Sequence, residues 1–147
     1  MPQALPIDPD GTVEVIALPD DRATRDRSIT SRLSGPAAPG CYHRQATMHL
    51  HDNGQHNRLP DNPIATALAC VWRGLDITND ATYFLPGRVV ITSVDGASDL
   101  PPDLVGEALA VTEAVHLLLA NGRTAPWGEV LRAASAAREG AGRKKSA

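Results

Sequence analysis

Two histidines close together in the chain, His49 and His51, have the spacing of a metal site. Alternate residues of a β-strand point to the same face, ~6.6 Å apart along the strand, so both imidazoles can reach one ion. Asp52 or His56, beyond the expected strand end, would supply a third ligand. The pattern predicts a divalent metal at His49 and His51. The alternative is that these histidines are only the solvated face of a strand, because the spacing lacks the specificity of paired Cys-x-x-Cys motifs.

Cys41 and His43 repeat this spacing upstream. If residues 41–51 form one continuous strand, its ends lie ~33 Å apart and the two pairs cannot share an ion. A single four-ligand site would require the strand to break near Gln45. Cys41 and Cys70 are the only cysteines, which is too few for a disulfide framework.

A second candidate site lies where a predicted hairpin meets the start of a helix. Asp52, Asn62 and Thr66 would surround free backbone N–H groups, which can bind an anion or a peptide carboxylate. The alternative needs no ligand, because Asn62 is a favourable N-cap and Thr66 an ordinary first-turn residue.

The charges are distributed unevenly along the chain. The overall net charge is −3, yet residues 132–147 carry +4 and the remainder −7. An acidic body with a basic tail is typical of proteins that contact nucleic acid or a charged partner. The candidate nucleic-acid contacts are Arg138, Arg143, Lys144 and Lys145. The alternative is a solubilising, disordered end.

Three arginines in the segment after Pro19 form another basic group. Arg22, Arg25 and Arg32 fall on one side of a predicted helix and could contact phosphates. A solvated face balanced by neighbouring acids is the alternative, and the acids are Asp20, Asp21 and Asp26.

Several catalytic motifs are missing from the sequence. It has no Gly-x-Ser-x-Gly elbow, no Gly-x-x-x-x-Gly-Lys loop and no Gly-x-Gly-x-x-Gly after a strand, so we assign no catalytic residue. Aromatic residues make up only 3% of the chain, which argues against a stacking platform for single-stranded nucleic acid. No apolar run is long enough for a signal peptide or a spanning helix, so we expect a cytoplasmic protein with no membrane partner.

Hydrophobic periodicity predicts the elements that must position these residues. Strands are expected at 3–7 and 12–18, joined by a type I turn at Asp8-Pro9-Asp10-Gly11. Further strands are expected at 41–51, returning over 55–59 through an Asn53-Gly54 turn, and at the apolar run 88–92.

Helices are expected at 63–73, at 104–120 and, more briefly, at 128–138. Residues 20–34 are expected to form a surface helix or an ordered loop. Together these elements predict an α+β fold with a small sheet of about four to five strands, mostly antiparallel hairpins, packed by two main helices. Residues 1–138 would form one domain, and residues 139–147 a disordered basic tail.

Three segments together resemble a small uncharacterised family, domain of unknown function 3846. They are Met48-His49-Leu50-His51-Asp52-Asn53-Gly54, Leu59-Pro60-Asp61-Asn62-Pro63-Ile64-Ala65-Thr66-Ala67-Leu68 and Gly87-Arg88-Val89-Val90-Ile91-Thr92. Asp52 stands for the acidic residue that ends the family's first strand, whereas Ser93 replaces its final Gly. The resemblance covers roughly residues 10–95. It implies an accessory protein of a phage, plasmid or integrated element, and implies no reaction or ligand.

These observations predict a non-enzymatic accessory binding or regulatory protein of a bacterial mobile genetic element, acting on an unidentified macromolecular partner, in the first place a protein. Twelve arginines against two lysines, with twenty-two alanines, indicate a GC-rich bacterial or phage genome. Two alternatives stay open: a metal-dependent, hydrolase-like enzyme using His49 and His51, and a weak nucleic-acid-associated protein that binds through its tail. No cofactor is expected other than the possible divalent metal.

Overall fold

A computed structural model describes residues 2–53, 57–73, 85–120 and 127–146. They form a five-stranded antiparallel sheet in the order β2-β1-β5-β4-β3, together with four helices. The strands are β1 Gln3–Ile7, β2 Ile16–Ala17, β3 Ala37–His43, β4 Ala46–His51 and β5 Val89–Ser93, and the helices are α1 Arg22–Leu33, α2 Pro63–Arg73, α3 Pro102–Ala120 and α4 Trp127–Ser146.

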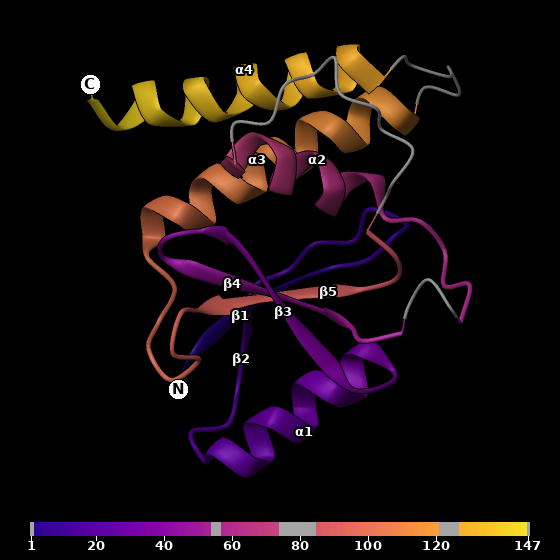
Figure 1. Ribbon diagram of the computed structural model, residues 1–147. Coiled ribbons are helices and arrows are strands. Elements are labelled where there is room, and N and C mark those ends of the chain that lie inside the picture. The colour runs from indigo at the N-terminus through magenta and orange to yellow at the C-terminus, as the bar shows by residue number, and fades with distance from the viewer. Residues whose placement is uncertain (1, 54–56, 74–84, 121–126, 147) are drawn as a thin grey trace.

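The helices cover both faces of the sheet. Helices α2 and α3 lie on one face with α4 beyond them, and α1 lies on the other (Figure 1). The α2–α3 face encloses the larger core, whereas the α1 face has a small one built around Ile29, Leu33 and Val90. The α+β prediction is therefore confirmed. Residues 20–34, expected as a surface helix or an ordered loop, contain α1, and α4 is longer than the expected short C-terminal helix.

The central strand β5 owes its position to its side chains. All five residues Val89–Ser93 are buried, as the β-branched run predicted. Val89 and Ile91 face the α2–α3 core, while Val90 and Thr92 face α1. Because both faces of β5 are covered, it lies between β1 and β4, with which it pairs antiparallel.

Helix α1 begins and ends as its sequence directs. The Asp21 side chain caps the first turn, accepting from the Thr24 N–H at 3.0 Å. Ser34 takes the left-handed conformation with φ 63°, and the Gly35 N–H returns to the Thr30 carbonyl. A Cβ on Gly35 would lie 2.2 Å from His51 Nε2, so only glycine permits this approach of the helix end to β4.

The expected continuous strand over residues 41–51 is wrong. The chain turns at Arg44 and Gln45, and β3 pairs back onto β4 with His43 opposite Ala46. Residues 37–40, for which no strand was expected, therefore contribute most of β3. The turn is stabilised because His43 Nδ1 accepts from the Gln45 N–H at 3.0 Å, a local contact of the kind that Asn or Asp side chains make in turns.

Other expectations about the strands were also too long or misplaced. The turn at Asp8-Pro9-Asp10-Gly11 forms, with the Gly11 N–H donating to the Asp8 carbonyl, but β2 is reduced to Ile16–Ala17 and one bridge at Val13. Pro6, which has no N–H, cannot donate to the ladder there. No strand returns over the described residues 57–59, and Gly54 to His56 lie outside the described residues.

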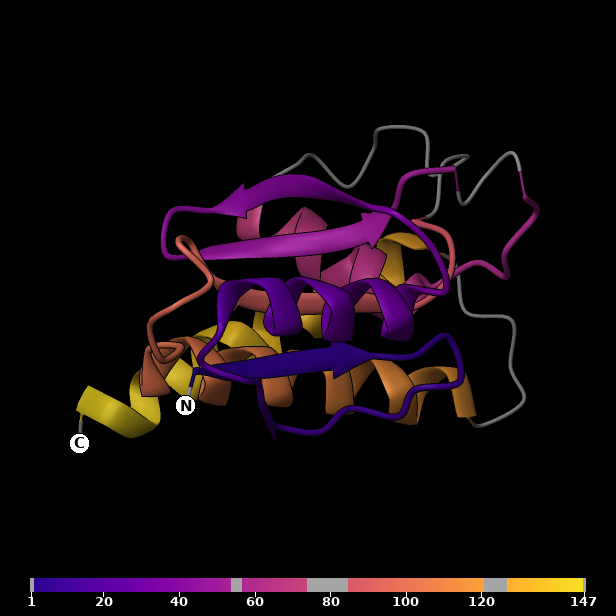
Figure 2. The ribbon, with the colours of Figure 1, turned by 90° about the horizontal axis from the view of Figure 1, so that it is seen from below.

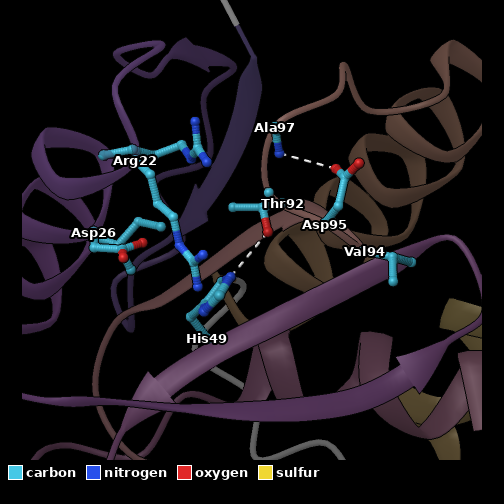
Figure 3. Close-up of a pocket in the computed structure, with 10 residues that line it drawn as sticks. Arg22, Asp26, His49, Thr92, Val94, Asp95 and Ala97 are labelled. Carbon is cyan, nitrogen blue, oxygen red and sulfur yellow. Dashed lines mark hydrogen bonds between the residues drawn. The ribbon is translucent and has the colours of Figure 1, made fainter.

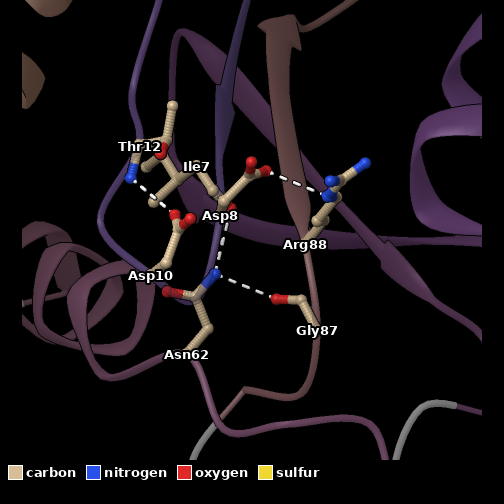
Figure 4. Close-up of polar contacts among 7 residues, drawn as sticks. All are labelled: Ile7, Asp8, Asp10, Thr12, Asn62, Gly87 and Arg88. Atoms are coloured by element: carbon tan, nitrogen blue, oxygen red, sulfur yellow. Dashed lines mark hydrogen bonds and ion pairs between the residues drawn. The ribbon is translucent and has the colours of Figure 1, made fainter.

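Helix α2 starts at a buried asparagine that also joins two strands. Asn62 is fully buried, and its Oδ1 accepts from the Ala65 N–H at 3.0 Å as the predicted N-cap. Its Nδ2 donates to the carbonyls of Ile7, at 3.0 Å, and Gly87, at 2.9 Å, as Figure 4 shows. One amide therefore connects the end of β1, the approach to β5 and the first turn of α2.

The C-terminal helix exceeds its expected range of 128–138. Helix α4 continues to Ser146, because Ala, Arg, Glu and Lys in this segment favour a helix, so residue 139 is not where regular structure ends. Arg138 fixes α4 in place. Its Nη1 donates to the Val71 carbonyl at 2.7 Å in the last turn of α2, and its Nε lies 2.6 Å from Glu107 Oε1 on α3.

We expect Asn62→Asp to lower the free energy of unfolding by about 3 kcal/mol or more, although Asp caps a helix as well as Asn does. A carboxylate would face the Ile7 and Gly87 carbonyls and leave both without a donor. Urea unfolding followed by circular dichroism measures the loss. Asp21→Asn, at the exposed cap of α1, is the matched control and should cost less than about 1 kcal/mol. Equal costs would mean that Asn62 acts only as a cap.

Candidate functional site

A polar cavity of about 380 Å³ lies between α1 and the sheet. Its walls come from the first two turns of α1, from His49 on β4 and Thr92 on β5, and from the loop Val94–Ala97 that follows β5. Figure 3 shows Arg22 and Asp26 on the α1 side, with His49 and Thr92 on the sheet opposite. The volume is at the low end of the range of about 300–1,000 Å³ usual for ligand sites.

His49 is held against the sheet rather than left free in solvent. Its Nε2 lies 2.9 Å from Thr92 Oγ1 on the neighbouring strand. Thr92 Oγ1 donates its single proton to the Ser93 carbonyl at 2.9 Å, so in this arrangement it accepts from His49 Nε2–H. Burial lowers the pKa of His49 below its ordinary value, and Asp26 opposes this by raising it. The imidazole is accordingly neutral near pH 7.

Thr92 and His49 do not form a nucleophile and base pair of the usual kind. Although their separation is suitable, Thr92 is 0% exposed and its proton is directed to a backbone carbonyl. The hydroxyl therefore orients the imidazole and is not open to a substrate.

Arg25 is the most unusual residue of the cavity wall. It is 6% exposed, yet it forms no ion pair with any carboxylate in the part of the chain that the structure describes. Its Nη1 donates to the Asp20 carbonyl at 3.0 Å. The Asp21 carboxylate acts on Arg25 only through its charge, whereas a buried guanidinium normally forms an ion pair, because removing a charge from water is costly.

The loop after β5 closes the cavity with a self-contained turn. The Asp95 carboxylate accepts from the N–H groups of Ala97 and Ser98 and from the hydroxyls of Ser93 and Ser98. These hydrogen bonds lower the pKa of Asp95 to about 2. The adjacent Gly96, with φ +72°, passes close to Arg25, since a Cβ built on it would be 3.7 Å from Arg25 Nε.

The two histidines of the predicted metal site form different hydrogen bonds. Both side chains lie on the α1 side of β4, but His51 Nδ1 accepts from the Asn53 N–H at 2.9 Å. A neutral His51 then carries its proton on Nε2 and has no lone pair left for an ion. Within the described ranges, no three His, Cys, Asp or Glu side chains come together to hold a metal. Asp52 is exposed, and His56 lies outside the described residues.

His43 lies on the opposite face of the sheet from His49 and His51, because the β3–β4 turn places it beside Ala46. Its ring packs edge-on against Trp72 with centroids 5.1 Å apart. Burial lowers the pKa of His43, and Glu107 opposes the shift. His43 and Cys41 therefore lie on a strand that pairs with β4, but His43 is not a partner of the other two imidazoles.

The predicted anion site at the start of α2 is occupied by internal contacts. Asn62 uses its amide as described above, and Thr66 Oγ1 donates to the Asn62 carbonyl at 2.8 Å while accepting from the Leu85 N–H at 2.9 Å. Asp52 is in an exposed turn and shares no contact with either residue. These positions support the alternative in which Asn62 and Thr66 are structural.

The predicted nucleic-acid contacts divide in two. Arg138 joins α4 to α2 and α3 and is not available as a free cation. Arg143, Lys144 and Lys145 belong to α4, but their side chains lie outside the described residues.

Sequence reasoning identified Arg22, Arg25 and His49 in separate hypotheses and did not connect them. Thr92 was not predicted as a site residue. It lies near the end of a buried apolar strand, and alternation along the strand places its side chain on the face opposite the larger core, which was a usable signal. The cavity joins residues from three distant segments, and no spacing rule covers such distances.

No protein-family model, curated protein or solved structure matches this chain. The resemblance to domain of unknown function 3846 therefore stays a prediction. None of the helices in the described part of the chain is long and apolar enough to cross a membrane.

We expect the protein to lose stability as the pH falls below about 6.5, the ordinary value of histidine. His49 and His43 have lowered pKa values in the folded chain, so the unfolded chain binds protons first. Their contribution is complete above the ordinary pKa and is lost as the pH falls through the lowered one. Urea titrations between pH 5 and 8 should show a shallower slope for His49→Gln than for wild type. Thr30→Gln, at an exposed and non-titrating position on α1, is the control and should leave the slope unchanged.

We expect the purified protein to hold far less than one equivalent of divalent metal, because the His51 lone pair is already used and no group of three metal ligands comes together among the described residues. Elemental analysis of the dialysed protein, with thermal melts before and after chelator, measures this. A tightly held equivalent that disappears in the double variant His49→Ala, His51→Ala would contradict the expectation and support a metal-dependent enzyme.

Proposed function

We propose that this chain is a non-enzymatic binding protein of accessory or regulatory type, which acts on a macromolecular partner in the bacterial cytoplasm. The partner, in the first place a protein, presents a negatively charged group to the cavity between α1 and the sheet. The observation that carries the proposal is the buried Arg25, which lines this cavity and has no carboxylate partner among the described residues.

The arrangement of the cavity supports binding more than catalysis. Its hydroxyl and its imidazole are bound to each other, the hydroxyl is fully buried, and the Asp95 oxygens are used by neighbouring donors. These groups are fixed in place, which favours recognition of one ligand geometry. A metal-dependent, hydrolase-like activity at His49 and His51 is the runner-up.

The rim of the cavity offers a contact surface for a larger partner. Val94 is 63% exposed, which is unusual for a valine, and it lies at the mouth of the cavity beside Asp95. An apolar rim next to a charged pocket is a common arrangement at recognition sites, since the charge orients the partner and the apolar contact adds affinity. A role in a mobile genetic element is part of the proposal and rests on the sequence resemblance and the composition alone.

Photo-crosslinking in the organism of origin tests this proposal. A crosslinking amino acid at Val94 should give a discrete adduct with one partner, and Arg25→Met in the same chain should remove it. Leu117, which is 58% exposed on α3 on the other side of the sheet, is the matched control and should give no such adduct.

Two results would overturn the proposal. Identical adducts from Val94 and Leu117, unaffected by Arg25→Met, would mean that the cavity selects no partner. Substrate turnover by the purified chain that is lost in His49→Gln would make it an enzyme.

A further inference from the structure

The free donors of Arg25 open onto the cavity. One of its N–H groups, on Nη1, is used by the Asp20 carbonyl. Its Nε and Nη2 have no hydrogen-bond partner among the described residues. Neither atom is among the buried polar atoms of those residues that solvent does not reach. Arg25 lines the cavity, and Nε and Nη2 of a guanidinium are adjacent, parallel donors.

Arg25 is buried without an ion pair, and its charge is only partly compensated by the attraction of the Asp21 carboxylate and by the hydrogen bond to the Asp20 carbonyl. An anion in the cavity would supply the remaining compensation, because a charge removed from water needs a counter-charge and hydrogen bonds. Nε and Nη2 of one guanidinium match two oxygens of a carboxylate or phosphate in a bidentate pair. Arg25 therefore lowers the stability of the empty protein and favours ligand binding, which is expected of a residue at a functional site and not of one in a structural ion pair.

Arg22 supplies a second guanidinium on the same wall. It is three residues before Arg25, so both side chains lie on one face of α1, and both line the cavity. Arg22 likewise has no ion pair with a described carboxylate, including Asp26 one turn later. Both arginines belong to the first turn of α1, where the helix dipole also favours negative charge.

Two carboxylates also line the cavity, and neither occupies the arginines. The oxygens of Asp95 accept four hydrogen bonds from its own turn. Asp26 is exposed and acts on His49 only through its charge. Among the described residues, no three His, Cys, Asp or Glu side chains come together in a group that could hold a metal ion.

The number of donors distinguishes between anions. A carboxylate carries one negative charge, so it can balance only one of the two guanidinium charges. A phosphate monoester has three terminal oxygens and close to two negative charges at pH 7, and it can accept from both arginines at once.

We propose that this cavity is a binding site for a phosphate monoester dianion, with Arg25 as the bidentate ligand and Arg22 as the second cation. This inference rests on the proposed function and deepens it by naming the group that the partner presents. Phosphorylated side chains and small phosphorylated molecules share this chemistry.

Titration of the full-length protein with inorganic phosphate and with O-phosphoserine, followed by calorimetry and thermal melts, tests the site. We expect saturable binding in the millimolar range or tighter for wild type, with a rise in melting temperature. Arg25→Met should weaken binding at least about tenfold, and Arg22→Gln about threefold. Arg27→Gln, an exposed arginine of α1 that does not line the cavity, is the matched control and should bind as wild type does.

Melting without phosphate separates a ligand residue from a structural one. Arg25→Met should melt at the same temperature as wild type or higher, because removing a buried charge without an ion pair offsets the lost hydrogen bond to the Asp20 carbonyl and the lost attraction of Asp21. If Arg25→Met instead lowers the melting temperature and wild type shows no response to phosphate, the inference is overturned. Arg22→Gln, at an exposed position, keeps the test valid if Arg25→Met does not fold.

The outcomes also separate this inference from the proposed function. A Val94 crosslink without phosphate binding would retain the partner and reject the phosphate. Phosphate binding without a crosslink would retain the site and reject the macromolecular partner. Phosphoserine binding much more tightly than inorganic phosphate would identify a phosphorylated side chain as the source, and equal affinities would identify a small phosphorylated molecule. If a phosphodiester oligonucleotide binds and neither inorganic phosphate nor phosphoserine does, the assignment is overturned.

Discussion

The buried amide of Asn62 is the constraint on which the arrangement of this protein depends. It satisfies the Ile7 carbonyl at the end of β1, the Gly87 carbonyl before β5 and the Ala65 N–H in the first turn of α2. Buried backbone groups must find such partners, and here one side chain serves three of them. The amide therefore sets where α2 leaves the sheet and where β1 and β5 meet, and the larger core forms around that junction.

The two faces of the sheet are used differently. The α2–α3 face is filled with aliphatic side chains, as the fully buried Leu68, Ile91 and Val111 illustrate. Figure 2 looks onto the other face, where α1 lies along the strands. Its apolar contacts are confined to a few residues near Ile29 and Leu33, and the remaining space under its first two turns is the polar cavity. Stability is concentrated on one face, which leaves the other available for a site with an unpaired charge.

Local signals predicted most of the elements correctly. Asn62 was identified as a cap, helices were expected where α2 and α3 lie, and the β-branched run became the central strand. The prediction failed where a long-range pairing overrode the local pattern. The alternation of residues 41–51 continues through Arg44 and Gln45, which have no turn preference, yet pairing of β3 with β4 requires a turn there. Histidine side chains make the hydrogen bonds that stabilise these turns: His43 Nδ1 accepts from a backbone N–H in the β3–β4 turn, and His51 Nδ1 accepts from one after β4.

The sequence by itself determined the fold class, the caps, the central strand and the face of β4 that carries His49 and His51, because these follow from contacts between residues near one another in the chain. Only the tertiary structure decided what the polar residues do. Arg25, His49 and Thr92 are brought together by sheet pairing and by the packing of α1, and Arg138 is directed to an unpaired carbonyl of α2. Burial and partners decide whether a guanidinium is a solvated surface charge or a ligand for an anion, and both quantities exist only once the chain has folded.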